Sequence, residues 1–107
     1  MTQAQKSRRE MLESFVAANP ADAFARYGLA VECASQGDNE AAVTHFRELL
    51  AGHPDYVTGY FQLGQLFARL TRYDEAREVI ADGIAAAQRT GDSHARDEMA
   101  AFRRELP

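Results

Sequence analysis

The side chains best able to bind a metal ion or attack a substrate are few in this sequence and lie far apart. They are one cysteine, Cys33, and three histidines, His45, His53 and His94. Two ligands on one helical face must be three or four residues apart, and no pair of these residues has that spacing. Cys33 also matches an apolar position later in the chain, which favours a buried structural thiol over a reactive one. We expect no metal site.

Catalytic and phosphate-binding patterns are equally hard to find. No nucleophile stands beside a base in a recognisable motif, and the glycines occur singly rather than in a glycine-rich loop. The acidic stretches Asp74-Glu75 and Asp38-Asn39-Glu40 stand where helices are expected to begin, and negative charge there stabilises the helix dipole. The sequence therefore predicts a protein that is not an enzyme and has no cofactor.

Composition narrows the classes of partner. The 107 residues are 46% hydrophobic and 26% charged, which is typical of one soluble globular domain. The net charge of −4 and the scattered basic residues argue against nucleic-acid binding. A single cysteine, no secretory leader and no apolar run of about 18 residues predict a cytoplasmic protein that does not enter a membrane.

The pattern of apolar residues predicts an all-α protein. Alternating β-branched runs are absent, and the helix-breaking stretches divide the chain into six amphipathic segments. Short connections of about two to four residues make consecutive helices antiparallel neighbours. The predicted helices span roughly residues 3–18, 22–36, 39–51, 56–70, 73–89 and 93–106.

Two stretches of the chain repeat each other with an offset of 34 residues, the distance from Pro20 to Pro54. In this alignment Leu29-Ala30 falls on Leu63-Gly64, Cys33 on Phe67, Ala42 on Ala76, and Phe46 on Ile80. The pattern resembles the tetratricopeptide repeat (TPR). The resemblance implies antiparallel helix-turn-helix pairs stacked as a right-handed α-solenoid.

Packing explains the small residues of this pattern, and the helix ends explain the glycine and proline. Ala30, Gly64, Ala42 and Ala76 are expected where neighbouring helices cross. At the end of the third helix, Gly52 is expected to adopt the left-handed conformation that closes a helix, and Pro54 to prevent its continuation.

The repeat pattern predicts one domain of four parts. Residues 1–20 form an N-terminal half-repeat helix, 21–54 the first repeat, 55–90 the second repeat, and 91–107 a C-terminal capping helix. Arg8 stands at the position that Ala42 and Ala76 occupy in the repeats, so a preceding helix cannot pack closely there. On this basis the chain is expected to begin with the half-repeat.

The resemblance also implies a function, because the first helix of each pair lines a concave groove in this family. The predicted role is a non-catalytic adaptor that binds a peptide or helix of another protein in this groove. The alternative is a self-associating structural protein whose groove or capping helix is buried in a homodimer. A second alternative is that these aromatic side chains are not accessible to a partner, because the first helix covers Phe24 and Tyr27, or the sixth helix covers Phe61. The predicted partner-binding residues are Phe24, Tyr27, Val31, Phe61, Gln62, Gln65 and Arg69.

Overall fold

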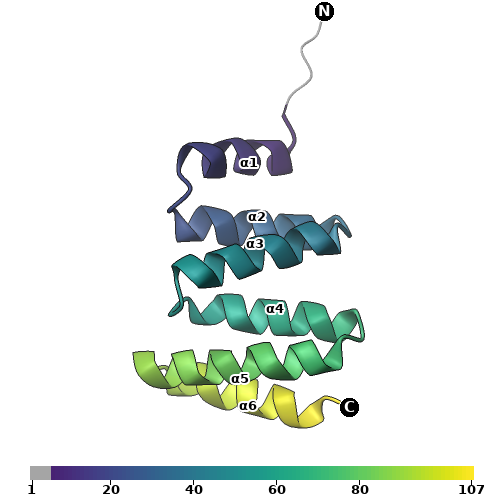
Figure 1. Cartoon of the computed structure of the whole chain (residues 1–107), viewed down its shortest axis with the longest axis vertical. Helices are drawn as coiled ribbons and strands as arrows, with labels where there is room; N and C mark the ends of the chain where they lie inside the picture. The colour runs from purple at the N-terminus through teal and green to yellow at the C-terminus, as the bar shows by residue number, and fades with distance from the viewer. Residues whose placement is uncertain (1–5) are drawn as a thin grey trace, which may run out of the picture.

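The computed structural model describes residues 6–107, and every regular element in that range is a helix. This confirms the predicted all-α class and the order of six helices (Figure 1). Their bounds are α1 Arg8–Ala18, α2 Ala23–Ser35, α3 Asn39–Gly52, α4 Val57–Arg69, α5 Tyr73–Thr90 and α6 Ser93–Glu105.

The first helix begins later than predicted. Helix α1 starts at Arg8, after Lys6 and Ser7. Residues 3–5, which were also predicted to be helical, lie outside the described residues. The physical reason is a capping box: the Ser7 hydroxyl accepts a hydrogen bond from the Glu10 amide, and the Glu10 carboxylate accepts one from the Ser7 amide. The ends of the other five helices lie within one or two residues of the predicted ones.

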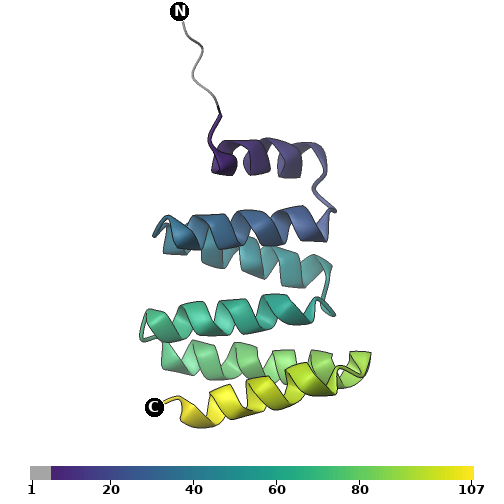
Figure 2. The same cartoon turned by 180° about the vertical axis from the view of Figure 1, so that it is seen from behind.

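The helices stack in two layers along the long axis of the molecule. Helices α3 and α5 lie in front in Figure 1, whereas α2, α4 and α6 lie in front in the reverse view of Figure 2. The molecule measures 55 × 28 × 19 Å, and its radius of gyration of 15.0 Å exceeds the roughly 13 Å of a compact domain of this size. We call the surface formed by α2, α4 and α6 the A-face.

Two of the turns stop a helix at the residue before a proline. Asn19 and His53, each followed by proline, have φ of −134° and −137° and ψ of 65° and 73°. A proline disfavours the helical conformation in the residue before it, which ends the helix. The expectation for Gly52 was therefore wrong: it is the last residue of α3, and its φ is not positive.

The left-handed conformation occurs instead in three other turns. Gly37, Thr71 and Gly91 have φ of 78°, 58° and 73° and follow α2, α4 and α5. In each turn the next residue's amide donates to a carbonyl near the end of the preceding helix, as Asp38 does to Cys33 at 2.9 Å. Each turn thereby folds one helix back onto the next.

The core depends on small residues where helices cross, as the repeat pattern predicted. Ala30, Ala42 and Ala76 are fully buried. A Cβ atom added to Gly64 would lie 2.3 Å from Cδ1 of Ile80. Helices α4 and α5 can therefore pack this closely only because residue 64 is a glycine. Large side chains fill the space between the crossings, and Phe46 and Phe67 are almost completely buried.

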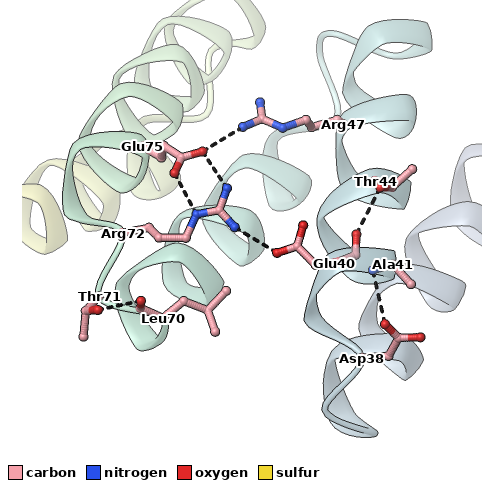
Figure 3. Close-up of polar contacts among 9 residues, drawn as sticks. All are labelled: Asp38, Glu40, Ala41, Thr44, Arg47, Leu70, Thr71, Arg72 and Glu75. Carbon is pink, nitrogen blue, oxygen red and sulfur yellow. Dashed lines mark hydrogen bonds and ion pairs between the residues drawn. The ribbon is translucent and has the colours of Figure 1, made fainter.

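A polar network ties the two repeats together on the α3/α5 side, opposite the A-face (Figure 3). Arg72 donates to Glu75 at 2.7 Å and to Glu40 at 3.2 Å, and Arg47 donates to Glu75 at 3.3 Å. The guanidinium carbons of Arg47 and Arg72 lie 5.3 and 4.7 Å from the centre of the Phe67 ring. The hydrogen bonds from Arg72 lower the pKa of the Glu75 carboxyl group.

Candidate functional site: the A-face

The seven predicted binding residues all lie on the two helices that the repeat pattern assigned to one face. Helix α2 carries Phe24, Tyr27 and Val31, and α4 carries Phe61, Gln62, Gln65 and Arg69. On α2 the residues are three and four positions apart, and on α4 Gln62, Gln65 and Arg69 have the same spacing, with Phe61 next to Gln62 and four residues before Gln65, so each set lies along one side of its helix. Figure 2 shows α2, α4 and α6 side by side on the face toward the viewer.

The structure distributes these residues over three adjoining hollows rather than one groove. The first, which we call the N-terminal groove, lies between α1 and α2 and has a volume of about 380 Å³. Leu12 and Phe15 line it from α1, and Phe24, Tyr27 and Val31 line it from α2. Its charged residues are Arg8 and Glu32, which form an ion pair at 3.2 Å.

The middle hollow lies between α2 and α4 and has a volume of about 330 Å³. Val31 and Ala34 of α2 supply its apolar surface beside the almost fully buried Phe46, and Gln62 and Arg69 of α4 supply polar groups. Val31 therefore belongs to both this hollow and the N-terminal groove. An amide and a guanidinium beside apolar surface can bind the backbone or an acidic side chain of a peptide.

The C-terminal hollow lies between α4 and α6 and has a volume of about 310 Å³. Phe61, Gln62 and Gln65 line it from α4, so Gln62 is shared with the middle hollow. Asp92 and Glu98 add carboxylates from the α6 side. Sequence reasoning missed this contribution because it assigned α6 only a capping role.

The aromatic residues of the A-face differ in how far they are free to bind a ligand. Phe24 is 77% exposed, so α1 does not cover it. Tyr27 is half-buried against Tyr56 and Phe46, with ring centres 5.5 and 6.3 Å away, and burial raises the pKa of its hydroxyl group. Tyr27 therefore also supports the core.

Helix α6 covers part of Phe61, which was one of the two alternatives for this residue. The ring centres of Phe61 and Phe102 are 5.5 Å apart in an edge-to-face arrangement, and both side chains are half-buried. Phe61 thus links α4 to α6 and presents only part of its ring to the C-terminal hollow.

The residues considered for metal or nucleophilic chemistry do not gather at one place: His94 is exposed and lines the C-terminal hollow, 3.5 Å from Glu98, and the others lie elsewhere. Cys33 is fully buried, and burial raises the pKa of its thiol, which keeps it protonated and weakly nucleophilic. A ring nitrogen of His53 lies 3.1 Å from the Ala21 carbonyl oxygen, in the turn between α1 and α2. Within residues 6–107, no three His, Cys, Asp or Glu side chains gather in a way that could hold a metal ion.

His45 is half-buried beside Arg26, whose guanidinium lies 3.3 Å from Nδ1 of the ring. Burial, followed by the positive charge of Arg26, lowers the pKa of His45. The imidazole is therefore neutral over a wider pH range than a free histidine.

Comparisons with known proteins agree with the repeat geometry. Family models described as tetratricopeptide repeat match residues 34–92 and residues 2–59. A TPR repeat-containing protein of Pseudomonas aeruginosa is 32% identical over 97 residues, which cover 91% of this chain and 92% of that protein. None of the helices in the described part of the chain is both long and apolar enough to span a membrane.

Two solved structures are similar in fold. The solution structure of a tetratricopeptide repeat domain protein from Salinibacter ruber has a TM-score of 0.77 and 36% identity, covering 81% of this chain and 88% of that one. The solution structure of a Bordetella parapertussis protein has a TM-score of 0.80 and 28% identity, and the match covers 95% of this chain and 89% of that one.

Proposed function

This chain belongs to the tetratricopeptide repeat family, and on that premise we propose that it binds a segment of another protein along its A-face. Repeats of this family generally mediate protein-protein interaction, and its members are typically non-catalytic. In this proposal residues 21–54 and 55–90 are the two binding repeats, and the helices at either end complete the face.

The continuity of the three hollows is the observation that carries the proposal. Val31 joins the N-terminal groove to the middle hollow, and Gln62 joins the middle hollow to the C-terminal one. An extended or helical segment that runs across α2, α4 and α6 can therefore contact all three helices through adjacent hollows. Recognition of a peptide or helix in such a groove is a common use of helical surfaces.

The lining residues suggest a segment of mixed character. The α1/α2 end offers apolar side chains such as Phe24 and Val31, whereas Gln62, Gln65 and Arg69 offer hydrogen-bond donors and acceptors nearer α6. Arg69 favours an acidic or carbonyl group of the ligand. We expect a segment with apolar anchors at one end and polar side chains at the other, neither strongly basic nor wholly apolar.

A photo-crosslinking residue at Gln65 tests this proposal in the cell that makes the protein. Because Gln65 lines the C-terminal hollow, irradiation should attach one recurring protein segment, which mass spectrometry can identify. The same photo-crosslinking residue at Gln88, an exposed position of α5, is the matched control and should not capture that segment.

The identified segment, made as a peptide, then allows a direct affinity measurement. Arg69→Ala should weaken its binding about tenfold, as expected for a residue that contributes measurably to an interface, while Gln88→Ala should leave the Kd unchanged. Arg69 is exposed, so its removal should not alter thermal stability. Tyr27 and Phe61 are poorer test positions because their rings also pack on Tyr56 and Phe102. Equal crosslinking at residues 65 and 88 would contradict the proposal.

A further inference from the structure

The large apolar side chains exposed in the described part of the chain are all on α1 and α2. They are Met11, Phe15, Phe24 and Val31, with exposed fractions of 55%, 48%, 77% and 37%. Phe15, Phe24 and Val31 line the N-terminal groove, which is the most apolar of the three hollows. A patch of this kind at one end of a chain is typical of an interface.

Gly28 lies on the floor of the N-terminal groove, and packing within the chain does not require a glycine there. A Cβ added to Gly59, Gly64 or Gly83 would lie within 3.0 Å of a neighbouring side chain. At Gly28 its nearest contact would be Cδ2 of Leu12 at 3.6 Å, which is an ordinary separation. A glycine inside a helix costs up to about 1 kcal/mol relative to alanine. Because Gly28 lies in the middle of α2 and lines the apolar groove, its missing side chain leaves room for a partner to approach α2 closely.

Arg8 decides how that approach can occur. In the repeats, Ala42 and Ala76 stand at the corresponding position and are fully buried under the first helix of their own pair. The Arg8 side chain is instead 71% exposed and paired with Glu32 across one end of the groove. A helix packed along α1, as α2 packs along α3, would collide with Arg8. The occupant must therefore cross α2 near Gly28 instead.

The groove has no net charge and its two ends complement each other, which favours a second copy of this chain as the occupant. The groove has one basic and one acidic residue, Arg8 and Glu32, and the rest of its lining is uncharged. A copy related by a two-fold axis places apolar surface on apolar surface, and it places the exposed Phe24 ring of each copy at the Arg8 end of the other groove. A contact between identical patches of two copies is the usual form of a homodimer.

We propose that the chain forms a two-fold homodimer in which the α2 helices of two copies cross at Gly28. Phe24 lies four residues before Gly28, and Glu32 lies four residues after it. In an antiparallel crossing centred on Gly28, the exposed ring of each Phe24 reaches the end of the other groove, where Val31 and Arg8 lie. The guanidinium of Arg8 can then stack on that ring. The contact fills the N-terminal groove, so a dimer and a segment that reaches this groove compete for it, whereas Gln62, Gln65 and Arg69 lie outside the contact. Dimerisation itself does not depend on binding of another protein.

Sedimentation velocity over a wide concentration range, up to millimolar, tests the dimer. The chain should show a monomer-dimer equilibrium that ends at twice the monomer mass. Phe24→Asp should weaken dimerisation about tenfold or more, because a buried aromatic anchor is replaced by a charge. Thr58→Asp is the matched control: Thr58 is the exposed residue of α4 that corresponds to Phe24, and its substitution should leave the dimer intact.

A second variant tests the crossing point. Gly28→Gln introduces the residue that α4 carries at the corresponding position, Gln62, and should abolish the dimer while the monomer stays folded. Circular dichroism melting of dilute samples checks the fold of each variant. Arg69→Ala should not affect dimerisation, which separates this proposal from segment binding.

Three results would overturn the inference. The first is a monomer at every concentration, and the second is a dimer that neither Phe24→Asp nor Gly28→Gln weakens. The third is a sedimenting species whose molecular mass exceeds that of a dimer and keeps increasing with concentration, which indicates head-to-tail assembly rather than a closed two-fold contact.

Discussion

At the scale of single residues, the stability of this protein depends on glycines that contact crossing helices. Gly64→Ala places a Cβ 2.3 Å from Ile80, so α4 and α5 must move apart or Ile80 must leave its rotamer. We expect a loss of about 1 to 3 kcal/mol in the free energy of unfolding, measured by urea denaturation. A bulkier residue such as leucine should cost more.

The same change at Gly52 is the control for this prediction. Gly52 is helical, and an added Cβ would have no atom within 4 Å, so Gly52→Ala should be neutral or stabilising by up to about 1 kcal/mol. Equal losses at residues 52 and 64 would show that the crossing of α4 and α5 is not the cause.

His45 makes stability depend on pH below about 6.5, the ordinary pKa of a histidine. Its pKa is lower in the folded chain than its ordinary value of about 6.5, so the unfolded state binds the proton more readily. Stability from this group is therefore fully present above about pH 6.5 and is lost as the pH falls through the lower folded pKa. The lowered pKa values of Asp38 and Glu75 act only below about pH 4.5.

Urea denaturation at several pH values between 7 and 5 measures this effect. The parent chain should lose stability over this range, whereas His45→Gln, which keeps an acceptor for Arg26, should show a flatter profile. Parallel profiles for the two proteins would assign the pH dependence to another group.

At the scale of elements, the three left-handed turns have the same geometry but different residues. Gly37 and Gly91 adopt a positive φ at little cost, whereas Thr71 is β-branched and has a φ of 58°. Thr71→Gly should therefore raise the free energy of unfolding by about 1 kcal/mol, the lower end of the strain stored at such a residue. The reciprocal change, Gly37→Thr, should destabilise the turn between α2 and α3. Thermal melts of both variants measure the difference, and a lower melting temperature for Thr71→Gly would contradict it.

At the scale of the whole molecule, a stack of helices is held together by contacts between neighbours. Helix α1 packs on α2 through Val16 and Leu12, and Arg9 pairs with Asp38 at 2.9 Å. Removal of residues 1–18 uncovers the side of α2 that these residues contact. The truncated chain should aggregate or melt at a lower temperature, which light scattering and circular dichroism can measure. A soluble truncation with an unchanged melting temperature would make α1 an accessory element.

Much of the fold could be predicted from the sequence because its signals are local or periodic. The offset of 34 residues between Pro20 and Pro54 identified the repeat, and small residues such as Gly64 and Ala76 marked the helix crossings. Apolar spacing located all six helices, since amphipathic periodicity reflects which side of a helix is buried. The same reasoning placed Tyr27 and Phe61 on related faces of α2 and α4.

Only the tertiary structure decided which residues of that face are free. Local signals do not say which surfaces meet, so the contacts of Phe61 with Phe102 and of Tyr27 with Tyr56 were invisible in the sequence. The division of the A-face into three hollows, and the exposure of Phe24 above Gly28, likewise depend on how α1 and α6 pack against α2 and α4. Helix formation follows from residues near in sequence, whereas the shape of a binding surface follows from side chains that only the completed fold brings together.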